Sequence, residues 1–398
     1  AAAPAAAQEW DVNVGGHFQS HVVYSTAGGP GNAGSDFDGL NFRTDAEIDF
    51  APSITLDNGL TFSALVELEG QESDGGQIDH TFMTISGDTL GTIQIGNLNS
   101  VTWNNSFQTP GVGSIGIDSG TMSGFFPLVE GRTGAPTAAS YVDNGAGTAA
   151  SLVLDFGQDS FTPTAHPDFS GDSMKINYIT PSFNGFTLGL SYTPRVAGDS
   201  VNTGPIDRND ADELNDVWGI SADYNQSMGS IDLGLHAHYQ QAERTAFALT
   251  ATDDTSGGVT APADLTVTGV NTDPSNWGVG VNVGFDAFTI GMNYAEVDSD
   301  LAGTSYGDST HLALGATYDT GIWTFGADFI TQDNKSAGTG GADIEQTAYR
   351  IGASRDLGPG VAWDIFAISY DGDDKGAAGT GSADVDGQMI GTAITLSF

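Results

Sequence analysis

Apolar and polar residues alternate along most of this chain. One segment shows the pattern clearly, with large apolar residues at the odd positions: Trp277-Gly278-Val279-Gly280-Val281-Asn282-Val283-Gly284-Phe285. A period of two places successive side chains on opposite faces of a β-strand. The apolar faces tend to begin and end on an aromatic ring, which is typical of strands that cross a membrane with rings at both interfaces.

Sixteen segments with this period are predicted as strands. They cover 8–24, 40–56, 59–71, 77–87, 91–97, 173–181, 185–194, 213–226, 229–243, 275–286, 287–298, 309–319, 322–333, 343–357, 361–371 and 384–398. An even number is typical of a bacterial barrel made from one chain. We therefore expect an all-β fold: a 16-stranded antiparallel transmembrane β-barrel that forms a single domain over residues 1–398.

The predicted connections alternate between short and long. Short ones such as Asp57-Asn58-Gly59 and Gly358-Pro359-Gly360 have the residues that tight turns need, whereas 25–39, 195–212 and 244–274 are long. This asymmetry is typical of the periplasmic and extracellular ends of outer-membrane barrels. The connection 97–172 is far longer than the others, and a loop of that size is usually functional. We expect it to fold into the lumen as a constriction loop.

The last predicted strand ends on Phe398, with Ile390, Ile394 and Leu396 on the same face. An aromatic ring at this position suits a membrane interface. The Ala-rich segment 1–7 is interpreted as a flexible N-terminal extension of a mature chain, left after removal of a signal peptide.

Composition narrows the class of protein further. No stretch approaches the roughly 18 apolar residues of a membrane helix, so a helical membrane protein is excluded. The chain has 10 Lys and Arg against 51 Asp and Glu, a formal net charge of -41, which argues against nucleic-acid binding. This charge fits either an acidic surface of the kind that keeps proteins soluble in brine or an anionic pore and loops that attract cations.

At this point the sequence resembles a general, non-specific outer-membrane porin of the alphaproteobacterial type. The resemblance rests on Gly91-Thr92-Ile93-Gln94-Ile95-Gly96 before the long loop, the strand–turn–strand from Ser173 to Tyr192, the strand count and Phe398. It implies a homotrimer in the cell outer membrane, surrounded by membrane lipid and lipopolysaccharide. Each barrel would be a water-filled channel narrowed by its third external loop, with acidic loop groups facing basic wall groups. The loop is longer than this family leads us to expect.

Charged side chains on the predicted polar faces are the candidates for lining the pore. Arg43, Lys175 and Arg350 are the basic wall candidates, although each has the alternative of pairing with a nearby acid. Asp118 and Glu130 are the acidic candidates of the constriction loop. The densest predicted acidic patch on the wall consists of Asp45, Glu47, Asp49, Glu67 and Glu69.

Other polar groups offer weaker candidates. His236 and His238 share a predicted lumen face and need a third ligand to hold a metal. Closely spaced carboxylates at outer strand ends make weak Ca²⁺ candidates, namely Asp298, Asp300, Asp371 and Asp373, with ordinary solvation as the alternative. No other cofactor is predicted. The loop aromatics either form a slide for sugars or fasten the loop to the wall, and we favour fastening.

No catalytic motif is found, so an enzyme is not expected. The sequence predicts a passive diffusion channel for small hydrophilic solutes and ions, with a preference for cations. Three alternatives stay open: a solute-specific channel with a binding site in the long loop, a structural or adhesive barrel plugged by that loop, and a soluble acidic β-protein.

Overall fold

The computed structural model describes residues 9–29, 36–70, 78–106, 109–117, 122, 124–125, 128, 167–196, 214–252, 264–299, 308–335, 343–374 and 384–398. These residues are nearly all strand, with one short helix, α1 (Val101–Asn104). Within the described ranges, no helix is both long enough and apolar enough to span a membrane.

The strands follow one another along the chain with mostly short connections on one side. They are β1 (Asp11–Gly28), β2 (Gly39–Thr55), β3 (Thr61–Glu69), β4 (Ile78–Gly87), β5 (Gly91–Asn97), β6 (Met174–Ile179), β7 (Phe186–Arg195), β8 (Leu214–Met228), β9 (Ile231–Thr252), β10 (Asp264–Thr272), β11 (Ser275–Phe285), β12 (Phe288–Asp298), β13 (Ser309–Asp319), β14 (Thr324–Asn334), β15 (Ile344–Gly358), β16 (Val361–Asp374) and β17 (Val385–Ser397).

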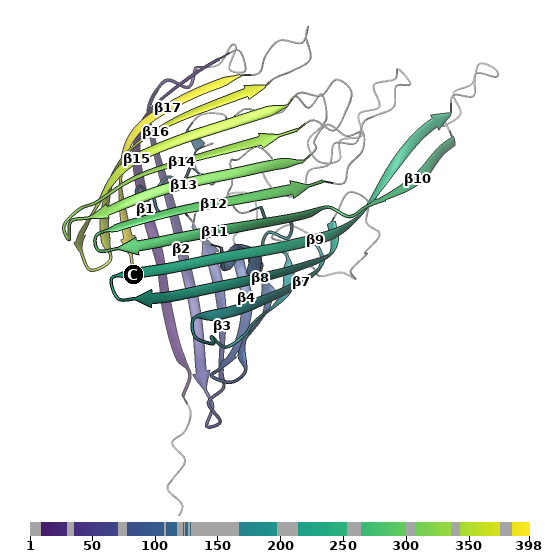
Figure 1. Ribbon diagram of the computed structural model, residues 1–398, viewed down its shortest axis with the longest axis horizontal. Coiled ribbons are helices and arrows are strands. Elements are labelled where there is room, and N and C mark those ends of the chain that lie inside the picture. Colours follow the sequence, from purple (N-terminus) through teal and green to yellow (C-terminus); the bar gives the residue numbers. More distant parts are fainter. Residues whose placement is uncertain are drawn as a thin grey trace, which may run out of the picture.

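All strand neighbours are antiparallel, and the sheet closes on itself because β1 pairs with both β2 and β17 (Figure 1). Of the 17 strands, β10 pairs within the described residues only with β9, and the other 16 strands form the closed ring. The predicted 16-stranded antiparallel barrel is therefore confirmed. Closure gives every strand of the ring two neighbours, as a sheet in lipid requires.

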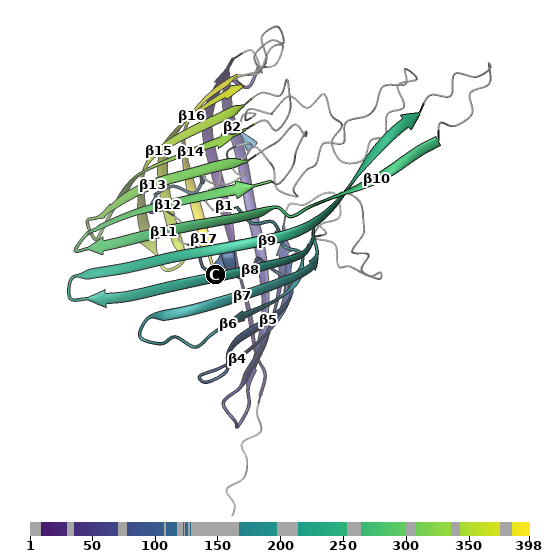
Figure 2. The same ribbon diagram turned by 45° about the vertical axis from the view of Figure 1, so that its right-hand side comes forward.

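The outer half of β9 and the whole of β10 form an arm that projects beyond the barrel (Figures 1 and 2). The predicted strand ended at 243, and 244–274 was predicted to be a loop, which was wrong. Thr and Ala are frequent in 245–252 and Thr is frequent in 264–272, so the apolar period is weak there. Pairing of Asp264 with Thr252 through Thr272 with Arg244 builds the arm, and this register is a long-range property that a local pattern does not report.

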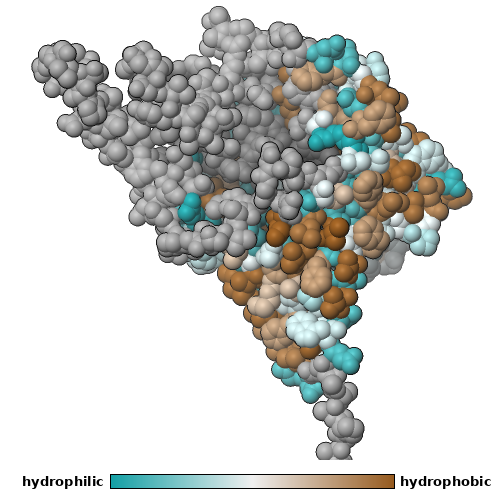
Figure 3. Space-filling model, turned by 180° about the vertical axis from the view of Figure 1, so that it is seen from behind, coloured by the Kyte–Doolittle hydropathy of each residue, from teal (hydrophilic) through white to brown (hydrophobic). Residues whose placement is uncertain are grey.

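The apolar faces point away from the barrel axis, as the alternation predicted. Exposed rings and aliphatic side chains cover the outer surface, seen as brown patches in Figure 3. Aromatic pairs lie near the strand ends: the ring centroids of Phe288 and Tyr318 are 4.6 Å apart, and those of Tyr192 and Trp218 are 4.3 Å apart. Such a surface is stable in lipid, and the opposite faces of the strands are left to line the interior.

Short turns connect the strands at the end of the barrel opposite the β9–β10 arm. Gly360 has φ +72°, and a Cβ there would lie 2.1 Å from the carbonyl oxygen of Ser397. Glycine is therefore needed to bring the β15–β16 turn against the end of β17.

Candidate functional site

The long connection after β5 first folds onto the inner wall at β7 and β8. Helix α1 packs so closely there that a Cβ on Gly189 would lie 2.8 Å from Cβ of Val101, and one on Gly219 would lie 3.0 Å from Cγ2 of Thr102. Asn105 Nδ2 also donates to Ser221 Oγ at 2.9 Å. Two wall glycines and one amide thus hold the entry to the loop against the wall.

The chain then lies against the opposite wall. Residues 109–117, called here the crossing segment, run over inward glycines of β12 to β15. A Cβ on Gly315 would lie 2.1 Å from the Pro110 carbonyl oxygen, and one on Gly326 would lie 2.6 Å from Cγ2 of Val112. A Cβ on Gly352 would lie 2.4 Å from the carbonyl oxygen of Val112. Residues 97–172 were predicted to enter the lumen, and their described parts do so.

Arg350, one of the three predicted wall cations, anchors the crossing segment. Its Nε and Nη2 donate to the two carboxylate oxygens of Asp328 at 2.9 and 2.8 Å. Its Nη1 donates to the carbonyl oxygens of Gly113 and Ile115 at 2.9 and 2.6 Å. The side chain is buried and its charge is balanced by Asp328, the pairing alternative that the sequence left open.

Lys175 holds the two ends of the loop together. Its Nζ donates to the carbonyl oxygens of Gly171 and Ser173 at 2.6 and 2.7 Å, and also to that of Leu98. The residue is only 3% exposed. Lys175 therefore faces inward as predicted, but loop carbonyls cover its ammonium group and separate it from the lumen water.

Arg43 differs from the other two cations because its side chain stays exposed. Its guanidinium carbon lies 5.7 Å from the ring centroid of Phe125, a cation–π distance. It also lies against Gly124, where a Cβ would clash with Nη1. Among the described residues, Arg43 makes no ion pair, so its charge remains available at the edge of the loop.

An apolar cluster fastens the middle of the loop to the wall. From the loop it contains Ile115, Ile117, Met122, Phe125 and Leu128, packed with wall residues that include Val23, Ile330, Phe366 and Met389. Phe125 thus fits the fastening interpretation of the loop aromatics. Trp103 is half-buried in α1. The other five, Phe107, Phe126, Tyr141, Phe156 and Phe161, lie outside the described residues.

The predicted acidic patch lies together on β2 and β3. We call it the acidic wall; it consists of Asp45, Glu47, Asp49, Glu67 and Glu69. In the β2–β3 register Glu47 is opposite Glu69 and Asp49 is opposite Glu67.

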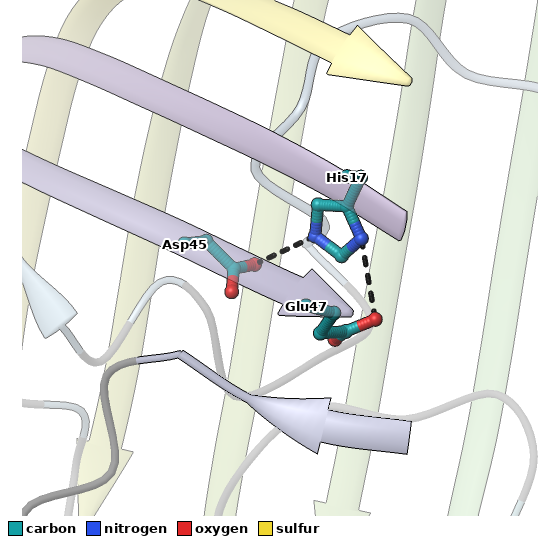
Figure 4. Close-up of side chains that lie close together, drawn as sticks. All are labelled: His17, Asp45 and Glu47. Carbon is teal, nitrogen blue, oxygen red and sulfur yellow. Dashed lines mark ion pairs between the residues drawn. The ribbon is translucent and has the colours of Figure 1, made fainter. Parts of the chain in front are cut away.

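Histidines flank the acidic wall on both sides. On β1, His17 lies between Asp45 and Glu47, with Nε2 3.6 Å from Asp45 Oδ2 and Nδ1 3.2 Å from Glu47 Oε2 (Figure 4). On β4, His80 Nδ1 lies 2.6 Å from Glu67 Oε2, and its Nε2 lies 2.9 Å from Asp172 Oδ1 of the long loop. The sequence analysis missed His80, although it lies in the predicted strand that follows the one with Glu67.

A model of the Gram-negative porin family matches residues 1–375. This chain belongs to the Gram-negative porin family. No curated protein matches the sequence of this porin.

Solved structures show the same fold. The anion-selective porin of Comamonas acidovorans is 16% identical, with 98% of this chain and 100% of that chain covered and a TM-score of 0.55. OmpT of Vibrio cholerae in its trimer form is 13% identical, with coverages of 98% and 99% and a TM-score of 0.56. OmpF of Salmonella typhi, in complex with daunomycin, is 15% identical, with 97% of each chain covered and a TM-score of 0.54.

At these identities the likeness to solved structures shows the fold alone. The family and the barrel place this porin in the outer membrane, which confirms the predicted location and the resemblance to general porins. The family and the fold support an outer-membrane diffusion channel, so the lumen that the loop enters is the candidate functional site.

Several predicted site residues lie away from the acidic wall. Asp118, Glu130 and Asp300 are outside the described residues. Asp298 ends β12, and Asp371 and Asp373 lie near the outer end of β16, both exposed. The described residues bring three His or carboxylate side chains within 4.8 Å at two other places, His17–Asp45–Glu47 and Glu67–Asp79–His80. The Ca²⁺ candidates belong to neither group.

His236 and His238 are buried on β9, as their shared face predicted. His236 Nδ1 lies 2.6 Å from Asp223 Oδ1, and its Nε2 lies 3.0 Å from His238 Nδ1. These contacts form an interior hydrogen-bond network, and the pair belongs to neither group of three.

Proposed function

We propose that this porin is a passive diffusion channel for small hydrophilic solutes and ions that prefers cations. The observation that carries the proposal is the unequal exposure of inward charges. Lys175 and Arg350 are buried under loop carbonyls, and Arg350 is neutralised by Asp328. Within the part of the chain that the structure describes, Glu47 and Glu67 of the acidic wall pair with the half-buried histidines His17 and His80 rather than with a buried Lys or Arg.

The net field at the lumen wall follows from this difference. On this part of the wall, the five carboxylates of the acidic wall lie beside one exposed cation, Arg43, and two half-buried histidines. Rings or patches of carboxylates in a narrow aqueous path raise the local concentration of cations and oppose the entry of anions. The anion-selective relative from Comamonas acidovorans shares only the fold, and selectivity depends on the side chains that line the lumen rather than on the barrel.

The described parts of the loop favour an open channel rather than a barrel that the loop plugs. The crossing segment lies flat against the wall, with backbone atoms in contact with wall glycines. A loop held at the wall narrows the lumen from one side. Absence of any conductance from the folded protein would favour the plugged structural barrel, and saturable block by one solute would favour the solute-specific channel.

The test is the reversal potential in planar bilayers under a KCl gradient. We expect the wild-type protein to prefer K⁺, and the variant Asp45→Asn/Glu47→Gln/Glu67→Gln to lose most of that preference because it removes up to three negative charges from the lumen. The matched control is Glu345→Gln/Asp371→Asn/Asp373→Asn, which removes three acids from the outer ends of β15 and β16. Anion selectivity in the wild type, or equal shifts in both variants, would contradict the proposal.

We also propose that the barrel forms a homotrimer surrounded by lipid and lipopolysaccharide. The support is the trimer form of the structurally similar OmpT of Vibrio cholerae and the broad apolar outer surface of this barrel. Chemical cross-linking in intact outer membranes distinguishes a trimer from a monomer.

A further inference from the structure

We propose that the inner wall of this porin binds a divalent transition-metal ion, with Glu67, Asp79 and His80 as ligands. The site lies between β3 and β4 at the edge of the acidic wall. The proposal goes beyond the channel function and does not depend on conductance.

The two carboxylate ligands lie next to the same ring nitrogen of His80. His80 Nδ1 is 2.6 Å from Glu67 Oε2 and 3.5 Å from Asp79 Oδ2, and all three ligand atoms are within 4.8 Å of one another. The register of β3 and β4 shifts between Val66 and Leu68. As a result, Asp79 and His80 on β4 both lie opposite a single residue of β3, Glu67. Such a bulge re-aims side chains, and here it turns two consecutive residues toward Glu67.

The other ring nitrogen of His80, Nε2, contacts side chains of the long loop. Its Nε2 lies 2.9 Å from Asp172 Oδ1 and 3.3 Å from Asn99 Nδ2, two residues of the long loop next to the wall. Histidines that bind metals usually donate their second N–H to a carboxylate, which orients the ring and makes the ligating nitrogen more basic. Asp172 is therefore a positioning residue, and the long loop completes the site.

A second triad adjoins the first. His17, Asp45 and Glu47 also bring their ligand atoms within 4.8 Å (Figure 4), and on the same strand as Asp45 and Glu47 the register places Asp49 opposite Glu67. Carboxylates that lie side by side repel one another, and a bound cation or a proton relieves this repulsion. In addition, Asp49 Oδ1 is buried without a hydrogen-bond partner among the described residues. The acidic wall therefore has more carboxylates than its two neighbouring histidines can neutralise.

The donor set selects the kind of metal. An imidazole nitrogen with carboxylate oxygens suits Zn²⁺, Co²⁺ or Ni²⁺, whereas Ca²⁺ takes oxygen ligands only. The side chains of Glu67, Asp79 and His80 are 15%, 29% and 18% exposed, so they are held in place and still reachable by an ion from water. The same ligand types on an open surface would lack the ordering contact from Asp172.

The test measures binding to the purified, folded porin in detergent. We expect Zn²⁺ to bind in isothermal titration calorimetry, and Co²⁺ to give visible absorption bands of a site with nitrogen and oxygen ligands. His80→Asn should weaken Zn²⁺ binding at least about tenfold and abolish the Co²⁺ bands, and Asp172→Asn should weaken binding by about 10- to 100-fold. The matched control is His311→Asn, an inward histidine of β13 outside both triads, which should bind Zn²⁺ like the wild type.

Two results would overturn the proposal. One is equal Zn²⁺ affinity of the wild type and His80→Asn, and the other is displacement of Zn²⁺ by an equal concentration of Ca²⁺, which indicates unspecific attraction to acids. If His80→Asn does not fold, Asp79→Asn replaces it, because Asp79 is the most exposed of the three ligands. Since the readout is binding, a porin without cation preference can still pass this test, and a selective one can fail it.

Discussion

Two regions of the inner wall are built from opposite kinds of residue. The region formed by β12 to β16, called here the neutral region, presents glycines and the balanced pair Arg350–Asp328, and the crossing segment lies directly on it. The region formed by β1 to β4, called here the acidic region, presents the acidic wall with His17 and His80, and its side chains remain partly exposed.

This difference shows how one loop can narrow a channel and leave a charged path. Glycine lets the loop backbone approach a strand closely, and a buried guanidinium with a carboxylate partner satisfies loop carbonyls that would otherwise lose their hydrogen bonds to water. Carboxylates cannot be covered in this way without a cation, because burial of unpaired charge is costly. The crossing segment thus lies on the neutral region, and the carboxylates of the acidic region stay partly exposed.

The largest expected effect on stability comes from breaking the ion pair Arg350–Asp328 of the neutral region. Arg350→Met leaves Asp328 buried and unpaired and frees two loop carbonyls, so we expect a loss of about 3–5 kcal/mol in the free energy of unfolding. The denaturant midpoint of the protein in lipid vesicles measures it. The double variant Arg350→Met/Asp328→Leu should regain much of this stability, and equal midpoints for wild type and Arg350→Met would show that the pair does not hold the loop.

A smaller effect is expected from adding one methyl group under the loop. Gly315→Ala places a Cβ against the Pro110 carbonyl, so the crossing segment must shift, at a cost of about 1–3 kcal/mol. We expect altered single-channel conductance together with lower stability. The matched control is Gly284→Ala on β11, where the added Cβ meets the Asp232 side chain at 3.3 Å and no loop residue. Unchanged conductance in Gly315→Ala would mean that this contact does not set the width of the channel.

The smallest effect concerns the exposed cation beside the acidic wall. Arg43→Gln removes one positive charge from the lumen, so the preference for K⁺ over Cl⁻ should increase, measured as a modest shift in reversal potential. Lys335→Gln is the control, since Lys335 is an exposed cation just beyond the outer end of β14. If both variants shift the potential equally, the effect comes from net charge and not from the position of Arg43.

The strands and their faces were largely predictable. Alternation predicts that Arg43, Lys175, Arg350 and the acidic wall share inward faces, and in the structure all three cations contact residues of the long loop. The arm formed by β9 and β10 was missed because the pairing of its two segments, rather than their apolar period, builds it. His80 was missed because a bulge in the β3–β4 pair decides its neighbours.

The sequence by itself determined the barrel and its place in the outer membrane, because a period of two is a local property of each strand. Only the tertiary structure decided which inward charges still face water. Lys175 and Arg350 occupy inward positions just as Arg43 does, yet carbonyl groups of residues far away in the chain, Leu98 for Lys175 and Gly113 for Arg350, help to bury the first two. Cover of this kind depends on strand register and on where a long loop meets the wall, and both arise from contacts between residues far apart in the chain.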